Sequence, residues 1–105
     1  MKFKQIGSKE LYELNINNKE DNINIDIVKS YNSPIIFINW TTQEFYLSEV
    51  AYNRSMTTSK HTNIYLKNYG KFSYWEDEFK TIPHNEMLNK CENLGLKVSI
   101  YGGLK

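Results

Sequence analysis

The strongest constraint on the fold is the alternation of apolar and polar residues in the first half of the chain. Tyr12, Leu14 and Ile16 alternate with polar residues, and the pattern returns over residues 23–27 after a polar, turn-forming loop. Because successive side chains of a strand point to opposite faces, this spacing places one apolar set on one face of a sheet. We therefore predict two strands here that pair across the loop.

The following segment is apolar on both sides. Asn32, Ser33 and Pro34 are expected to break the chain, and residues 35–38 are all apolar, which is typical of a central strand covered on both faces. A turn then leads into a further strand at residues 45–47. The pattern up to this point predicts an antiparallel meander.

Two helices are predicted in the second half. The first is capped by Thr57 or Thr58 and ends at Gly70, a residue type favoured just after a helix. The second covers residues 83–93, because proline suits a first helical turn and Gly95 lies just beyond the end.

The two helices differ in their expected buried stripes. That of the first helix is only moderately hydrophobic and consists of His61, Ile64, Tyr65, Asn68 and Tyr69. The apolar stripe of the second consists of Met87, Leu88, Cys91 and Leu94, so we expect the Cys91 thiol to be buried and unreactive.

A last strand is predicted from the alternation of Leu96, Val98 and Ile100 with polar residues. The chain of 105 residues then reads as a single α+β domain over residues 1–105. We predict an antiparallel sheet of about five strands covered by two helices in a two-layer sandwich.

Bulk properties narrow the classes of function. The net charge of +1 argues against a strongly electrostatic nucleic-acid binder and against an acidic mimic of DNA. Cys91 is the only cysteine, so no intramolecular disulfide is possible. No apolar run approaches the length of a bilayer, and we expect a cytoplasmic protein.

The most unusual local feature is a hydroxyl-rich segment at the start of the first predicted helix. Hydroxyl groups there can cap the free N–H groups of the first turn, and the same position suits a phosphate. Both uses stay open from the residues alone. The candidate anion- or nucleic-acid-binding residues are Arg54, Thr57, Thr58, Ser59, Lys60 and His61.

Catalysis is weakly supported. His61 lies one turn after Thr57 and Thr58, which places a base within reach of a hydroxyl. Capping explains the same hydroxyl groups without further partners, and the chain contains no phosphate loop and no metal-binding spacing of histidine and cysteine. We expect no enzyme activity, no cofactor and no metal.

A second unusual stretch spans residues 72–79 and combines aromatic with acidic side chains. Aromatic residues are enriched in interface hot spots, and neighbouring carboxylates can meet a basic partner. In the alternative interpretation, Phe72, Tyr74 and Phe79 fill the core while the acids face solvent. The candidate partner-binding residues are Tyr74, Trp75, Glu76, Asp77 and Glu78.

Part of the chain resembles a known family. The resemblance rests on residues 28–34 followed by an apolar strand, on residues 46–49 and Tyr52, and on residues 57–61 followed by Tyr65 and Leu66. Over roughly residues 28–70 the chain resembles a small uncharacterised family of phages and other mobile elements in low-GC Gram-positive bacteria. In that family, a Ser-x-Thr-Thr-x-Lys-His segment opens a helix. The resemblance implies an origin and no activity.

Two functions follow as expectations. The first is a phage-type accessory protein that binds and inhibits a host protein or ribonucleoprotein complex, such as a defence nuclease, in the manner of an anti-CRISPR protein. The alternative is a small nucleic-acid-binding module that places its hydroxyl-rich helix start on phosphates.

Overall fold

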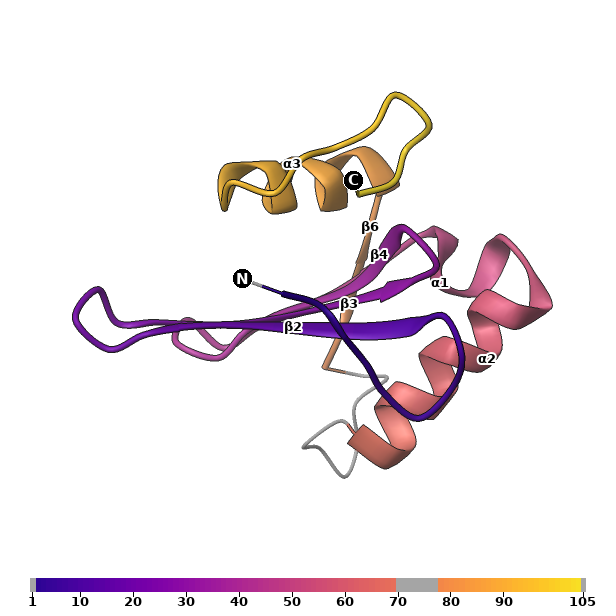
Figure 1. The fold of residues 1–105 in the computed structure, drawn as a ribbon, viewed down its shortest axis with the longest axis horizontal. Coiled ribbons are helices and arrows are strands. Elements are labelled where there is room, and N and C mark those ends of the chain that lie inside the picture. The colour runs from indigo at the N-terminus through magenta and orange to yellow at the C-terminus, as the bar shows by residue number, and fades with distance from the viewer. Residues whose placement is uncertain (1, 70–77, 105) are drawn as a thin grey trace.

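The computed structural model describes residues 2–69 and 78–104, and the strands of this part form one sheet in chain order (Figure 1). The strands are β1 (Lys4–Gln5), β2 (Leu11–Asn18), β3 (Ile23–Ser30), β4 (Ser33–Asn39), β5 (Glu44–Ser48) and β6 (Lys80–Ile82). The helical elements are α1 (Val50–Asn53), α2 (Met56–Ile64), the π-helical turn η1 (Tyr65–Tyr69) and α3 (His84–Asn93).

The predicted meander is confirmed. Strands β1 to β5 pair antiparallel with their chain neighbours, and Leu14 and Ile16 of β2 lie opposite Ile27 and Ile25 of β3. The parallel pairing of β6 with β5 was not predicted. This pairing depends on a connection that first passes through the helices, which local periodicity does not report.

The expected break at residues 32–34 is wrong in its extent. β3 and β4 are joined by the two residues 31–32 alone, and Pro34 lies inside β4. Proline lacks the N–H group that a strand donates, and it is tolerated here because the pairing register shifts at its partner, Lys29.

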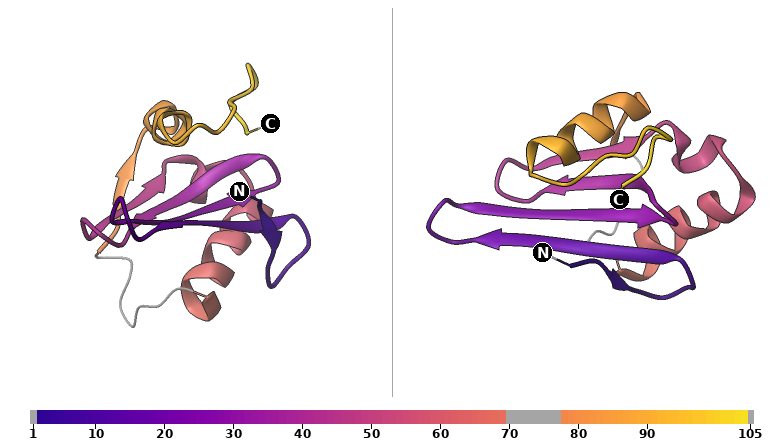
Figure 2. Two further views of the ribbon diagram at one scale, coloured as in Figure 1. Left: turned by 60° about the vertical axis from the view of Figure 1, so that its left-hand side comes forward. Right: turned by 45° about the horizontal axis from the view of Figure 1, so that its top comes forward.

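The sheet is covered on both faces, as Figure 2 shows. Ile36 and Ile38 of β4 belong to a core cluster with Tyr65 and Leu66, on the side of α2. Phe37 belongs to a second cluster, which contains residues of α3. The α+β class, with a mostly antiparallel sheet covered by helices, is therefore confirmed, and so is the two-sided burial of residues 35–38.

The first helix begins earlier than predicted. Ser55, and neither Thr57 nor Thr58, is its N-cap, and α2 passes directly into η1. Of its expected stripe, His61 and Tyr65 are buried. Ile64 is half-buried and Asn68 is exposed, so the stripe is narrower than predicted.

The second helix is confirmed, whereas the last strand is wrong. α3 follows Pro83, and Gly95 beyond its end has a φ of +91°, which glycine adopts without strain. Val98 makes an isolated bridge to Leu104, and the Ile100 side chain is 91% exposed. The chain turns back within residues 99–103, so the expected strand has no sheet to join. In the described residues, no helix has the length and apolar character needed to span a bilayer.

Candidate functional site

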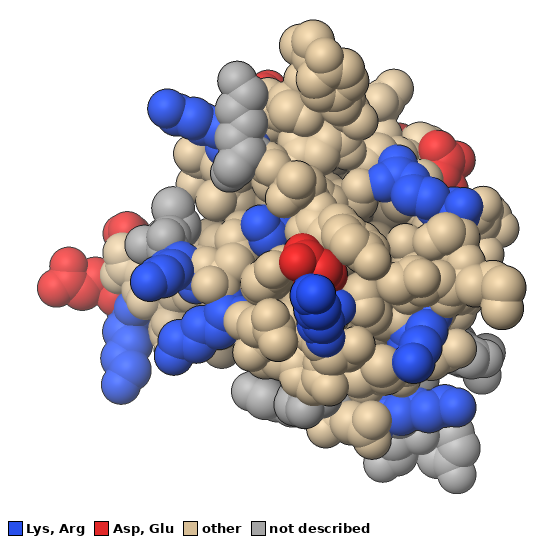
Figure 3. All heavy atoms as spheres, turned by 45° about the vertical axis from the view of Figure 1, so that its right-hand side comes forward, with Lys and Arg blue, Asp and Glu red and all other residues tan. Residues whose placement is uncertain are grey.

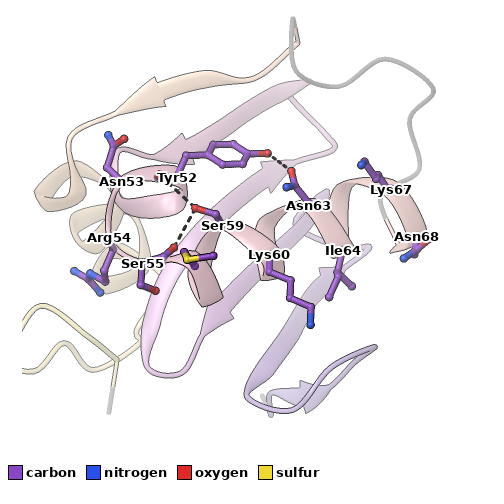
Figure 4. Close-up of a pocket in the computed structure, with 11 residues that line it drawn as sticks. Tyr52, Asn53, Arg54, Ser55, Ser59, Lys60, Asn63, Ile64, Lys67 and Asn68 are labelled. Carbon is purple, nitrogen blue, oxygen red and sulfur yellow. Dashed lines mark hydrogen bonds between the residues drawn. The ribbon is translucent and has the colours of Figure 1, made fainter.

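An open groove of about 610 Å³ runs along α1 and the outer side of α2 in the described part of the chain (Figure 4). Its lining residues come from two adjoining stretches of chain and combine cationic, amide, hydroxyl and apolar groups. They are Tyr52, Asn53, Arg54, Ser55, Met56, Ser59, Lys60, Asn63, Ile64, Lys67 and Asn68. We call this feature the α1–α2 groove.

Helical periodicity explains which residues of α2 and η1 line the groove. Met56, Lys60, Ile64 and Lys67 are spaced by four, four and three residues, so they lie on one side of the helix. The opposite side packs on the sheet and is buried, with Thr58, His61, Thr62 and Tyr65. The predicted binding residues on this helix therefore fall into two groups, those on the outer side of the helix and those on the side buried against the sheet.

Hydroxyl groups of α2 fix α1 against it. Thr62 Oγ1 lies 2.9 Å from the carbonyl of Ala51 in α1 and 2.9 Å from that of Thr58 in its own helix. Ser59 Oγ lies 3.3 Å from the carbonyl of Tyr52 and 3.0 Å from that of Ser55. The Tyr52 hydroxyl in turn donates to Asn63 Oδ1 at 2.9 Å. Ser59 of the hydroxyl-rich segment, together with Thr62 and Tyr52, therefore helps to hold the two walls of the groove together.

The start of α2 satisfies its own backbone. Ser55 Oγ accepts a hydrogen bond from the Thr58 amide at 3.1 Å and donates one to Thr58 Oγ1 at 3.1 Å. Thr58 is buried. Capping therefore accounts for these hydroxyl groups. Because Thr58 is buried, its hydroxyl is not available to an anion at the helix start.

The predicted anion-binding residues consequently separate. Arg54, Ser59 and Lys60 line the α1–α2 groove, whereas Thr57 is exposed outside it. His61 is 2% exposed and faces the sheet, so its inclusion in a surface site was wrong.

His61 belongs to a buried hydrogen-bonded pair with a serine. Its Nδ1 atom lies 2.6 Å from Ser30 Oγ. Burial is the largest effect on the imidazole and lowers its pKa, and the charge of Lys60 lowers the pKa further. A backbone hydrogen bond with Lys9 and the charge of Glu10 both raise the pKa, but the net shift is downward. The neutral form is therefore favoured, and in the tautomer protonated at Nε2 its Nδ1 atom accepts a hydrogen bond from the Ser30 hydroxyl.

A second pair of the same kind lies at α3. Ser48 Oγ is 2.7 Å from His84 Nδ1, and His84 Nε2 donates to the carbonyl of Gly102 at 2.7 Å. Ser30 and Ser48 are 2% and 1% exposed, so neither hydroxyl can meet a dissolved substrate in this arrangement. Both pairs were missed from sequence, because 31 and 36 residues separate the partners and no local pattern connects them.

The electrostatics of the groove are one-sided. Arg54, Lys60 and Lys67 contribute positive charge, and none of the eleven described residues that line the groove is acidic. Arg54 Nη1 also donates to Ser33 Oγ, which ties the guanidinium to the start of β4. Figure 3, which brings the α2 side forward, shows lysine and arginine side chains predominating over acidic ones on this face.

The acidic–aromatic candidate surface is only partly described. Tyr74, Trp75, Glu76 and Asp77 lie outside the described residues. Glu78 is exposed, and Phe79 is buried with its ring centroid 5.7 Å from that of Phe45. The alternative interpretation is thus confirmed for Phe79, and partner binding through residues 74–78 stays a prediction.

The remaining reactive group is buried as predicted. Cys91 has no exposed surface, and burial raises the pKa of its thiol to about 12. Among residues 2–69 and 78–104, no group of three or more histidine, cysteine, aspartate or glutamate side chains is placed to hold a metal ion.

Comparison with known proteins yields one relationship. A family described as "Family of unknown function (DUF8033)" matches residues 1–81. The chain belongs to DUF8033. The DUF8033 match includes β1 to β5, α1, α2 and the whole α1–α2 groove, whereas α3 lies outside it. No curated protein and no solved structure matches this DUF8033 chain significantly.

Proposed function

We propose that this DUF8033 protein is a phage-type accessory protein that acts by binding, and that it blocks a host macromolecular complex through the α1–α2 groove. The carrying observation is the 91% exposure of Met56, an apolar side chain that lines the α1–α2 groove together with three cations. The host complex that fits this proposal is a nucleic-acid-handling defence nuclease in the bacterial cytoplasm.

The chemistry of the groove supports a binding role. Methionine adapts its shape to a partner, and tyrosine and arginine are enriched in interfaces. Met56, Tyr52 and Arg54 provide these three types within one concavity, and Tyr52 is 41% exposed. The hydrogen bonds between α1 and α2 hold the surface in place before a partner arrives, which lowers the entropic cost of binding.

The buried Ser–His pairs support binding over catalysis. Ser30 and Ser48 each lie against a histidine, but both hydroxyl groups are sealed in the interior. Each pair joins a helix to the sheet, which is a sufficient structural role.

The test compares variants in a capture experiment from lysate of the organism that carries the protein. A Met56→Asp, Lys60→Glu variant changes two exposed groove side chains without touching the core. The control, Lys19→Glu, Lys97→Glu, introduces negative charge at exposed positions outside the groove. We expect the groove variant alone to lose the host complex and its inhibition. Retention of both by the groove variant would refute the assignment of the surface.

A third variant in the same experiment tests the other predicted surface. Replacing Trp75, Glu76, Asp77 and Glu78 by alanine removes the acidic–aromatic character of that segment. If this variant loses the host complex while the groove variant retains it, residues 74–78 carry the interaction instead.

A second candidate function is nucleic-acid binding, favoured by the three cations of the groove and its lack of acidic lining residues. Gel-shift titrations against single- and double-stranded DNA and RNA test it. A nucleic-acid module binds with an affinity that falls steeply with salt, because released counterions contribute to the binding free energy. Absence of a shift at low salt removes this candidate.

A further inference from the structure

We infer that the segment received by the α1–α2 groove is an acidic amphipathic helix of a protein partner. This inference rests on the proposed function and names the chemistry of the partner at the same site. Three features of the groove carry it: its length, its apolar contacts and the spacing of its charges.

The length of the groove suits a short helix. Its lining residues extend along α2 and η1 from Met56 to Asn68, and a rise of 1.5 Å per residue gives about 18 Å. A partner helix of about three turns covers the same distance when it packs along this side of α2. Figure 4 shows the lining side chains distributed along this length and Tyr52 lying beside the helix.

Apolar side chains occur at intervals within the groove. Met56 and Ile64 lie two turns apart on the same side of α2, and the Tyr52 ring lies by Asn63, to which its hydroxyl donates. An amphipathic helix buries its apolar stripe in such a groove through residues three or four positions apart. A phosphate backbone offers no apolar group to the Met56 and Ile64 side chains.

The cations alternate with the apolar residues along the same side of α2 and specify the charge of the partner. Lys60 and Lys67 are seven residues apart, which corresponds to about 10 Å along the helix axis. Carboxylates seven residues apart on a partner helix have the same spacing, and Arg54 meets a further acid near the end of the groove. The alkyl stems of both lysines add apolar contact while their ammonium groups stay solvated.

The experiment is an NMR titration of the ¹⁵N-labelled full chain with synthetic peptides of about 18 residues, a length of roughly five helical turns. The first peptide places leucine at helical spacing and glutamate on the flanks. The second has the same composition in scrambled order, and the third replaces glutamate by lysine. A single-stranded oligonucleotide serves as the fourth probe.

We expect the first peptide alone among the three to shift the amide signals of residues lining the groove. The Lys60→Glu, Lys67→Glu variant is expected to bind it about tenfold or more weakly, since two attractive contacts become repulsive. The control Lys19→Glu, Lys97→Glu makes the same change of net charge elsewhere and is expected to bind with unchanged affinity.

Two results overturn the inference. One is the absence of groove shifts with the patterned acidic peptide at about 1 mM, the weak end of specific affinity. The other is equal binding of the scrambled or lysine peptide. Failure of this inference is distinguishable from failure of the proposed function. If the groove variant loses the host complex but no peptide binds, the groove remains the interaction surface and only the acidic helix is rejected as its partner. Groove shifts with the oligonucleotide alone assign the surface to nucleic acid.

Discussion

The Nδ1 atom of His61 lies 2.6 Å from the Oγ atom of Ser30, and this contact joins α2 to the last residue of β3. The pair of Ser48 and His84 repeats the arrangement at 2.7 Å, with the serine as the last residue of β5 and the histidine as the first of α3. The helices on the two faces of the sheet are thus each held by a Ser–His hydrogen bond.

Removing one member of the first pair lowers the free energy of unfolding. Ser30→Ala leaves the buried Nδ1 atom of His61 without its partner, and a cost of about 1–3 kcal/mol is expected. Urea denaturation measures it. Thr57→Ala is the control, because Thr57 is exposed on the same helix that His61 belongs to, and its effect is expected within about 0.5 kcal/mol. Equal effects of the two substitutions would show that the pair contributes nothing.

Stability also depends on the protonation of His61. Burial lowers its pKa in the folded state, so between the folded and unfolded pKa values the unfolded chain binds more protons. The free energy of unfolding therefore falls as the pH drops below about 6.5, the ordinary pKa of histidine, with a contribution of at most about 1.4 kcal/mol per pH unit. Urea denaturation from pH 7.5 to 5.5 is expected to show a shallower decrease for His61→Gln than for the unmodified chain. If the unfolding free energies of the two proteins fall equally with pH, the pH dependence does not come from His61.

The helix cap gives a third prediction. Ser55→Ala removes the oxygen that accepts from the Thr58 amide and is expected to lower the unfolding free energy by about 1 kcal/mol. Ser55→Asp restores an acceptor at the same place, so the midpoint temperature of thermal unfolding should return close to that of the unmodified chain. If Thr57→Ala destabilises more than Ser55→Ala, the cap lies at the position first predicted from sequence.

The central strands and α3 could be predicted from the residues alone. The alternation around Leu14 and Ile25 determines sheet faces directly, and residues 35–38 are apolar on both sides because helices cover both. The helical stripe around Cys91 is similarly readable, since only one side of α3 is apolar. In these elements the local pattern and the tertiary environment agree.

The candidate site was harder to predict because α2 carries polar residues on every side. With threonine and histidine facing inward and serine and lysine outward, periodicity does not fix the phase of the helix. Thr58 and His61 were therefore grouped with Lys60, although only Lys60 faces the groove. The contribution of Tyr52 depends on α1 docking through Thr62, a tertiary contact without a sequence signature.

The thiol of Cys91 is expected to be inert in the folded protein. It has no exposed surface, and burial raises its pKa to about 12, so the reactive thiolate is scarce at pH 8. Labelling by a water-soluble disulfide reagent should proceed slowly in buffer and rapidly in urea. Rapid labelling without urea would show that the second core cluster opens far more readily than its packing indicates.

A polar contact beside the first core cluster gives the last prediction. Asp26 is 4% exposed, and its two carboxylate oxygens accept from Trp40 Nε1 at 2.7 Å and from Asn15 Nδ2 at 2.6 Å. Trp40→Phe keeps an aromatic ring and removes one donor, which should lower the free energy of unfolding by about 1–3 kcal/mol.

The loss of ring area contributes to that value, so a double-mutant cycle is needed to isolate the hydrogen bond. In an Asp26→Ala background the indole N–H has already lost its acceptor, and Trp40→Phe should then cost at least about 1 kcal/mol less than in the unmodified chain. Urea denaturation of the four proteins measures this coupling. A coupling energy near zero would mean that the indole packs beside Asp26 without a stabilising hydrogen bond. Of the two donors, Asn15 would then be the one that stabilises the carboxylate.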